Sequence, residues 1–265
     1  MKLCFSTLGC SDKSLEDIIS IAKKYNIPAL EIRGINGVMD NTAINVLAEV
    51  NREKTLELFC QNGIYPIVLG TSCSFHNGDK FDSALEEGEF SVKIAESLNI
   101  PNIRVFGDKI KDCECIDRVI SGLSQLCKCS DRVNILLEVH GDFNTVETLF
   151  PVIDKMADVK NFGLIWDIEH THKTYGDRWS EFYSFARPYI KHVHIKDFSD
   201  KSQCLSLIGS GSIPIAPIVE RLLSDDYDGY FSLEWEKKWH PELPDITAAL
   251  DSFIRTMNEV RDNGR

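Results

Sequence analysis

Short apolar runs alternate along the chain with segments in which apolar residues recur at every third or fourth position. The apolar runs predict buried strands, and the 3.6-residue spacing predicts helices with one buried face. The predicted strands are Lys2–Leu8, Ala29–Gly34, Ile64–Thr71, Asn102–Gly107, Asn134–His140, Phe162–Ile168, Ile190–Asp197 and Gly229–Trp235. The predicted helices are Ser14–Tyr25, Asn41–Asn62, Phe81–Leu98, Ile116–Cys129, Val146–Asp158, Trp179–Ala186, Ile215–Leu223 and Asp245–Val260.

Each predicted strand is followed by a predicted helix, with no low-complexity linker and no change of composition between units. This order predicts an α/β protein with one (β/α)₈ barrel as a single domain over residues 1–265, a length that suits such a barrel. A doubly wound sheet uses the same alternation and is the alternative. Ser14 and Asp17 fit the spacing of a capping box and mark the start of the first helix.

Composition and net charge argue against some classes of binding partner. The chain is 43% hydrophobic and 26% charged, which is typical of a globular protein with a sizeable core. A net charge of −12 argues against a nucleic-acid partner, because binding to phosphates needs a basic surface. No run approaches 18 apolar residues and the N-terminus lacks the form of a signal peptide, so we expect no membrane contact and a cytoplasmic protein.

The nine cysteines do not form a recognisable metal or disulfide pattern. Cys113/Cys115 and Cys127/Cys129 have the C-x-C spacing, whereas zinc ribbons and redox sites use C-x-x-C. We therefore expect reduced, mostly buried thiols, as is usual in the cytosol.

The stretch Ile190–Asp197 carries the most informative alternation. A strand with this pattern places His192, His194 and Lys196 on one face. A buried strand face rarely holds three such groups unless an anion or a metal lies opposite them. The alternative is an exposed edge strand with a polar face.

Acidic residues end the neighbouring predicted strands, where a barrel places its functional groups. Glu138, Asp167, His194 and Glu234 follow in this order on the last four strands. One imidazole and three carboxylates suit Mn²⁺, Mg²⁺, Co²⁺ or Zn²⁺, with positions left open for substrate oxygens. Any one of the carboxylates alone could be a capping or surface group, but four residues at equivalent strand ends favour a shared site.

The motifs around these residues resemble the xylose isomerase-like barrel superfamily, which includes sugar isomerases, epimerases, inosose dehydratase and endonuclease IV. The resemblance rests on Glu-x-His at Glu138, G-L-x-x-D-x-x-H from Gly163, H-x-H-x-K-D from His192 and G-Y-x-x-x-L-E-x-E from Gly229. It implies a metal held by Glu138, Asp167, His194 and Glu234. It also implies substrate contacts, which are expected at His170, Lys196, His140, Glu31 and His192.

Some of these residues have a second interpretation. Glu31 could instead form an ion pair with Arg33 or a neighbouring strand, and His140 and His192 could be buried, satisfied histidines. Trp235 should point away from Glu234 towards the helices. His76, His172 and His240 are expected at the surface.

The resemblance implies a divalent-metal-dependent sugar or sugar-phosphate isomerase or epimerase that acts by proton abstraction through a metal-bound enediolate. Glu138 and Glu234 would be the two bases, the substrate would be a carbohydrate, and a homodimer or homotetramer would be usual for the family. An inosose dehydratase-type lyase and a non-catalytic sugar-binding barrel are the alternatives. Endonuclease IV is not favoured, because strand four ends without a histidine and residues 206–213 lack Asp-x-His. Gly209 and Gly211 could bring backbone amides to a phosphate, as loops after strand seven often do.

Overall fold

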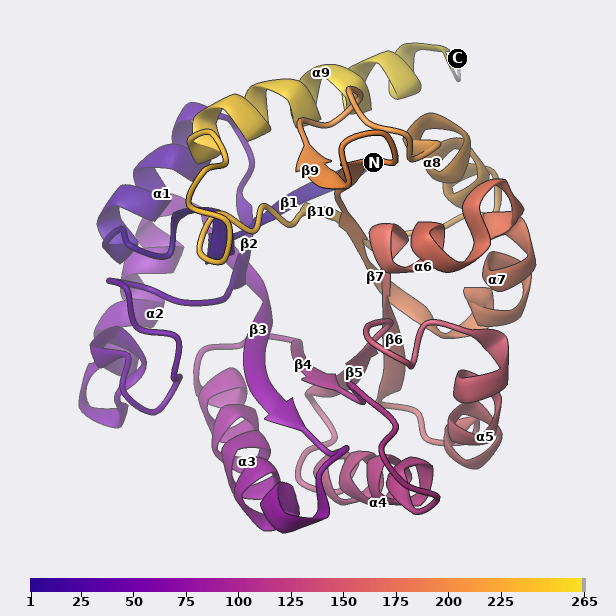
Figure 1. Ribbon diagram of the computed structural model, residues 1–265. Helices are drawn as coiled ribbons and strands as arrows, with labels where there is room; N and C mark the ends of the chain where they lie inside the picture. Colours follow the sequence, from indigo (N-terminus) through magenta and orange to yellow (C-terminus); the bar gives the residue numbers. More distant parts are fainter. Residues whose placement is uncertain (264–265) are drawn as a thin grey trace.

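A computed structural model describes residues 1–263. Eight parallel strands close into a barrel in the order β1-β10-β7-β6-β5-β4-β3-β2, and helices surround it (Figure 1). The predicted (β/α)₈ barrel is confirmed, and the doubly wound sheet is wrong because such a sheet would leave two open edges. The single domain over residues 1–265 stays a prediction. The barrel strands are β1 (Lys2–Ser6), β2 (Ala29–Ile32), β3 (Tyr65–Ser74), β4 (Asn102–Phe106), β5 (Asn134–Glu138), β6 (Phe162–Asp167), β7 (Ile190–Ile195) and β10 (Tyr230–Leu233).

The described helices lie outside the strands and cover the barrel (Figure 1). They are α1 (Leu15–Lys24), α2 (Arg52–Asn62), α3 (Phe81–Ser97), α4 (Cys115–Cys127), α5 (Val146–Met156), α6 (Ile168–Tyr175), α7 (Trp179–Ala186), α8 (Ile215–Ser224) and α9 (Ile246–Asn263). Ser14 is confirmed as the N-cap of α1, since its Oγ accepts from the Asp17 amide at 3.1 Å. The return bond of a capping box differs, because Asp17 Oδ2 accepts from Ser14 Oγ at 2.7 Å. In residues 1–263, none of the helices has both the length and the apolar composition needed to cross a bilayer.

The inward faces of the strands change from apolar to polar along the barrel axis. Near the start of the strands, Ala29, Leu136 and Ile165 belong to a small apolar cluster that fills the interior. Two residues further along the same strand faces stand Glu31, Glu138 and Asp167. Because strand side chains alternate with a period of two, one inward face supplies both an apolar floor and a polar mouth.

Strand β7 is not an edge strand. It pairs with β10 on one side and with β6 on the other. Val193 and Ile195 are fully buried in the main apolar core, and His192 and His194 point to the opposite, interior face. The polar face of this strand is therefore enclosed by the barrel, and the edge-strand alternative is wrong.

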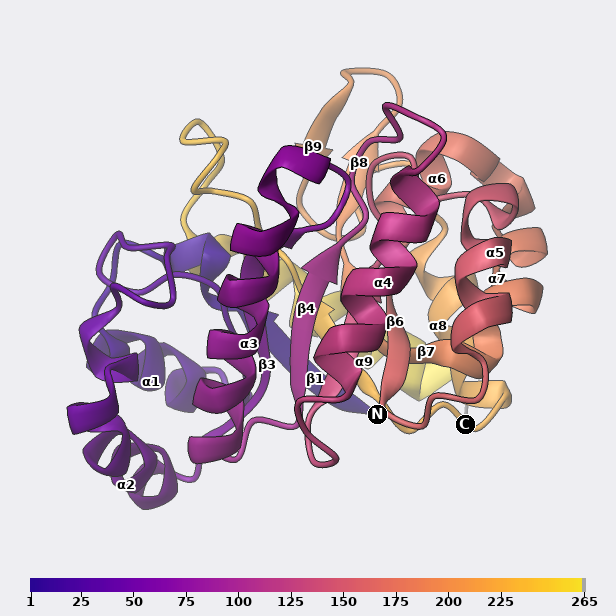
Figure 2. The same cartoon turned by 90° about the horizontal axis from the view of Figure 1, so that it is seen from below.

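Several segments differ from the sequence-based expectation. The helix expected over Asn41–Asn62 begins only at Arg52, and it follows two 3₁₀ turns, Asn45–Leu47 and Glu49–Asn51. The side-chain amide of the buried Asn41 donates to the Gly70 carbonyl at 3.0 Å. This hydrogen bond holds the segment around Asn41 as a loop. The sixth strand stops at Asp167, since α6 starts there. A hairpin of β8 (Asp197–Ser199) and β9 (Cys204–Ser206) was not predicted, and it stands beyond the strand ends in Figure 2.

All nine cysteines are free thiols. Cys4, Cys10, Cys73, Cys115 and Cys127 are buried, and the other four are exposed. Each C-x-C pair has one buried and one exposed member.

Candidate metal centre and substrate pocket

Four residues from four strand ends converge at the mouth of the barrel. Glu138 ends β5, Asp167 ends β6, His194 lies on β7, and Glu234 follows β10. One possible ligand atom of each lies within 4.8 Å of the others, and all four side chains are buried. These four residues are called the quartet below. The structure thus brings together the set that the sequence selected.

The donor atoms of the quartet fit a divalent cation. Glu138 Oε2, Asp167 Oδ2, His194 Nδ1 and Glu234 Oε2 are buried and make no hydrogen bond. The three carboxylate oxygens lie near the charges of Lys196 or Arg104. Buried polar atoms in this state are costly and uncommon. His194 Nδ1 lies 3.2 Å from Glu234 Oε2 and 3.8 Å from both Glu138 Oε1 and Asp167 Oδ2. A metal cation among these atoms would have all four as ligands and would share the three carboxylates with Lys196 and Arg104.

Neighbouring groups decide which atoms of the quartet face the centre. His194 Nε2 lies 2.9 Å from Glu31 Oε2, so its N–H donates there and Nδ1 is left for the centre. Asp167 is the N-cap of α6, because its Oδ1 accepts from the amides of Glu169 at 2.9 Å and His170 at 3.2 Å. Its second oxygen, Oδ2, is then left for the centre. Such supporting contacts orient metal ligands in proteins.

Glu31 lies beneath the quartet and is completely buried. The same Oε2 atom lies 3.3 Å from His192 Nε2, and Ser6 Oγ donates to Oε1 at 3.3 Å. Burial alone raises the pKa of Glu31, but the charge of His194 and the hydrogen bonds of both histidines hold it well below its ordinary value. The alternative ion pair with Arg33 is not formed, since that guanidinium donates to the Met39 carbonyl and Ser72 Oγ.

Lys196 directly follows β7, and its side chain lies beside the carboxylates of the quartet. Its Nζ lies 2.8 Å from Asp167 Oδ2, 2.7 Å from Glu234 Oε2 and 2.5 Å from Glu236 Oε1. Burial lowers the pKa of this lysine, but the charges of Asp167 and Glu234 outweigh burial and raise it well above its ordinary value. Lys196 is therefore a fixed positive charge beside the centre.

Arg104 is a site residue that the sequence analysis missed. It points inward from the middle of β4, and its Nη1 lies 3.1 Å from Glu138 Oε2 and 3.3 Å from Glu234 Oε1. Functional residues of a barrel are expected at strand ends, whereas Arg104 lies within β4 and reaches the mouth by the length of its side chain. The available signal was a charged residue inside an otherwise apolar strand, Ile103-Arg104-Val105, because such a charge requires a buried partner.

Two cavities open beside the quartet. The inner cavity, of about 130 Å³, is lined by Arg33, Arg104, Glu138, Lys196, Glu234 and Trp239, among others. The outer cavity, of about 380 Å³, lies beneath the β8–β9 hairpin and is lined by His170, Lys173, Phe198 and Leu205, among others. His140 and Glu236 line both cavities. The two cavities therefore form adjoining parts of one substrate-sized depression at the strand ends.

His140 and His170 stand together in this depression, with ring centroids 4.2 Å apart. Burial lowers the pKa of His170 to about 3, so this imidazole is neutral near pH 7 and can donate or accept a hydrogen bond. Both residues, together with Lys196, line the cavities as the resemblance implied. Contact with a substrate stays a prediction for all three.

The sequence model of the xylose isomerase-like TIM barrel family matches residues 16–257. The chain belongs to this family. No functionally curated protein matches it by sequence.

Three solved structures of similar proteins share the barrel over its full length. An IOLI protein with a bound zinc atom has 19% identity and a TM-score of 0.80, covering 100% of this chain and 99% of that one. A D-tagatose 3-epimerase-like protein has 22% identity and a TM-score of 0.77, covering 100% and 98%. A 3-keto-D-glucoside 4-epimerase from E. coli has 17% identity and a TM-score of 0.74, covering 99% of each chain. At these identities the similarity shows the fold alone.

The remaining sequence-based expectations for this family member are met in part. Trp235 points away from the centre as expected, since it is buried in the main core and its Nε1 donates to the Pro244 carbonyl at 2.9 Å. His192 lies below the quartet, against Glu31, and lines neither cavity. The expectation of a surface position for His172 is wrong, because its side chain is buried and its Nε2 lies 3.2 Å from Asp200 Oδ2.

The glycine loop after β9 does not offer its amides to a ligand. Asp197 Oδ2 accepts from the amides of Gly209 and Gly211, each at 2.8 Å. Asp197 Oδ1 accepts from the amides of Phe198 and Ile213. The loop is thus organised by the aspartate of the H-x-H-x-K-D motif, and the expectation of a phosphate contact at Gly209 and Gly211 is wrong.

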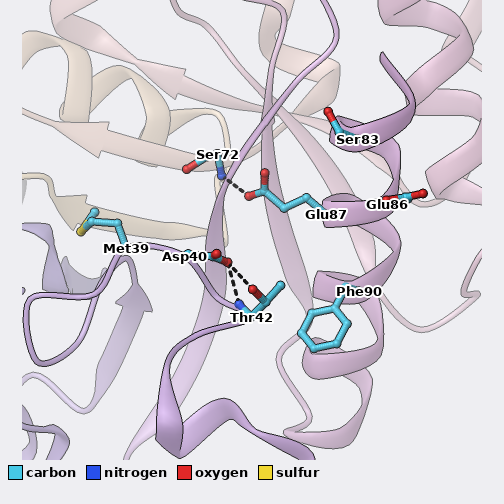
Figure 3. A pocket seen from close by; sticks show the side chains of 8 residues that line it. All are labelled: Met39, Asp40, Thr42, Ser72, Ser83, Glu86, Glu87 and Phe90. Carbon is cyan, nitrogen blue, oxygen red and sulfur yellow. Dashed lines mark hydrogen bonds between the residues drawn. The ribbon is translucent and has the colours of Figure 1, made fainter. Parts of the chain in front are cut away.

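A third cavity, of about 620 Å³, lies away from the quartet, between the loop after β2 and helix α3 (Figure 3). Two of its carboxylates are hydrogen-bonded to other lining residues. Glu87 accepts from the Ser72 amide at 2.6 Å, and Asp40 accepts from Thr42. No residue of the quartet or of the predicted substrate contacts lines it. Its size therefore does not make it the reaction site.

Proposed function

We propose that this protein is a divalent-metal-dependent isomerase or epimerase of a carbohydrate. The observation that carries the proposal is the quartet, in which four buried ligand atoms, from one imidazole and three carboxylates, meet beside a cavity. When bound, a divalent cation supplies Lewis-acid polarisation of carbonyl and hydroxyl oxygens, which lowers the cost of forming an enediolate by several kcal/mol.

Glu138 and Glu234 are positioned to move the proton. They come from β5 and β10, which are separated in the barrel by β6 and β7. Their carboxylates both line the inner cavity and share Arg104 as a partner. Two bases that approach a substrate carbon from different directions can remove a proton on one side and return it on the other.

Arg104 and Lys196 are positioned to stabilise the negative charge that develops on substrate oxygens. Both line the inner cavity, and both are held by contacts to the quartet. A cation already fixed in place stabilises a developing charge without reorganisation. His170 borders the outer cavity and can orient a substrate hydroxyl. The zinc of the IOLI protein and the epimerase names of the two other relatives support this proposal.

Metal content is the first measurement. We expect about one equivalent in the wild-type protein after reconstitution with Mn²⁺, Co²⁺, Mg²⁺ or Zn²⁺, and loss of that equivalent in His194→Ala. His76→Ala is the control, since His76 lies outside the quartet, beside Ser74 and Asp108. A wild-type protein that retains no metal would overturn the proposal.

Turnover is the second measurement. In a screen of ketoses and inososes with added metal, Glu234→Gln should lower kcat by about 10²–10⁴-fold while the circular dichroism spectrum is unchanged. Activity within tenfold of wild type would contradict the assignment of Glu234 as a base. Product analysis separates an epimer from the unsaturated product of a dehydratase-type lyase. Tight sugar binding without turnover would favour the non-catalytic barrel.

A further inference from the structure

The outer cavity has a larger volume than a monosaccharide bound at the quartet would fill. The inner cavity of about 130 Å³ accommodates only the reacting end of a sugar, whereas the outer one measures about 380 Å³. A water occupies about 30 Å³ in the liquid, and a hexose with its dozen heavy atoms takes on the order of 200 Å³. A monosaccharide held at the quartet would therefore leave most of the outer cavity to solvent.

Apart from His140, which follows Glu138 of the quartet, the walls of the outer cavity come from segments that supply none of the quartet. They are the β8–β9 hairpin, the first turns of α6 and the loop over residues 236–243. Lys173 Nζ of α6 lies 4.7 Å from the ring centroid of Phe198 of β8, and His172 of α6 pairs with Asp200 next to β8. These contacts fix the helix against the hairpin, so the outer cavity is built by the fold.

The lining combines apolar and hydrogen-bonding groups. Phe198, Leu205 and Leu243 supply apolar surface, and Glu169 and Lys173 form an ion pair beside them. Gln203, His240 and Glu242 add further polar groups. A purely apolar substituent would remove water from these charges without replacing its hydrogen bonds, at a considerable cost. A sugar ring presents C–H faces to apolar side chains and hydroxyls to polar ones, so it suits this lining.

We propose that the substrate is a glycosylated sugar. The carbonyl end of the reacting unit lies at the quartet, and a second sugar ring occupies the outer cavity beneath the hairpin. This inference rests on the proposed function, because the metal centre fixes which end of the substrate reacts.

The test compares D-fructose with four of its glycosides, each carrying one added hexose at a different oxygen: turanose, lactulose, leucrose and isomaltulose. Dissociation constants are measured by calorimetry on Mn²⁺-loaded protein of known metal content. We expect at least one disaccharide to bind at least tenfold more tightly than fructose. Leu205→Trp, which fills much of the outer cavity, should abolish this gain, so that no disaccharide binds the variant more tightly than fructose binds the same variant.

Two further variants complete the design. Cys204→Trp introduces the same bulk from an exposed position on the cavity wall and serves if Leu205→Trp fails to fold. Lys201→Trp, at the exposed hairpin turn, is the control and should leave every affinity unchanged. The inference is overturned if fructose binds as tightly as all four disaccharides, if the gain survives in the filled variants, or if metal-loaded protein binds none of the sugars. A protein without metal would instead overturn the proposed function itself.

Discussion

At the residue scale, the buried carboxylate of Glu31 decides which ring nitrogen of His194 faces the centre of the quartet. It holds His194 Nε2 at 2.9 Å, so Nδ1 faces the three carboxylates of the quartet. The imidazole of His194 lies between Glu31 and the centre of the quartet. Glu31 is therefore best described as a positioning residue, and its direct contact with substrate stays a prediction.

Replacing Glu31 by glutamine should weaken metal binding by about 10–100-fold, because the variant loses the charge that orients His194. The measurement is a competition titration against a chromophoric chelator, with thermal melting to show that the variant is folded. Glu53→Gln, on the exposed side of α2, is the matched control. An unchanged affinity in a folded Glu31→Gln protein would rule out this role.

Arg104 compensates two carboxylates of the quartet and should matter most when no metal is bound. In Arg104→Met the buried Glu138 and Glu234 lose their shared cation, and removal of one partner of a buried ion pair costs about 3–5 kcal/mol. Urea unfolding should show this loss without metal and a smaller one when Mn²⁺ is present. Arg132→Met removes an exposed guanidinium that pairs with Glu96 and should change stability by less than about 0.5 kcal/mol. Wild-type stability in metal-free Arg104→Met would contradict this account.

At the element scale, Asp197 joins the end of β7 to the loop that follows the hairpin. One carboxylate accepts four backbone amides, and these contacts fix the loop from Gly209 to Ile213. The loop in turn supports the hairpin, since the Ser212 amide donates to the Phe198 carbonyl at 2.7 Å. A change at this point should therefore affect both segments.

Gly211→Ala tests this arrangement. An added Cβ would overlap Asp197 Oδ1 and lie 2.6 Å from the Phe198 carbonyl oxygen, which is backbone and cannot move aside cheaply. We expect a destabilisation of about 1–3 kcal/mol by urea unfolding. Gly78→Ala is the control, because its nearest contact, at 3.7 Å to Arg118, is ordinary. A loss below about 0.5 kcal/mol in Gly211→Ala would show that the carboxylate can move without consequence.

At the scale of the whole molecule, Glu87 links stability to pH. This residue lines the third cavity and accepts from the Ser72 amide (Figure 3). Burial raises the pKa of Glu87 above its ordinary value. The folded state therefore favours the protonated form, and the associated stability is present below the unfolded-state pKa and is lost as pH rises through the folded-state value.

Glu87→Gln should remove this pH-dependent loss, because the amide keeps an oxygen for Ser72 and carries no charge. We expect a melting temperature about 1–3 °C above wild type at pH 7.5 and no gain at pH 4. Differential scanning calorimetry at both pH values is the measurement. Glu86→Gln, which lines the same cavity from an exposed position, should show no gain at either pH. Equal gains at both pH values for Glu87→Gln would contradict the role of its ionisation.

The sequence by itself determined the order of strands and helices and the residues at the strand ends, whereas closure into a barrel was settled by the tertiary structure. Strand and helix periods are local properties, so the apolar pattern located the barrel strands, and the period of two placed Glu138, Asp167, His194 and Glu234 on inward faces. It also identified the start of α1, because the contact of the Ser14 N-cap with the Asp17 amide spans only four residues. Local patterns failed where a local contact ended an element early, as the Asp167 side chain does at the start of α6.

Only the tertiary structure decided the contacts that close the site. Arg104 meets Glu234 across 130 positions of sequence, and Glu31 meets His194 across 163. Closure of the barrel brings such residues together, and no local period encodes which charges then become partners. The outer cavity, the hairpin above it and the nitrogen that His194 presents to the quartet depend on the same closure. The sequence therefore specified the groups that could hold a metal, whereas the closed barrel decided how they are oriented and which substrate shape they can receive.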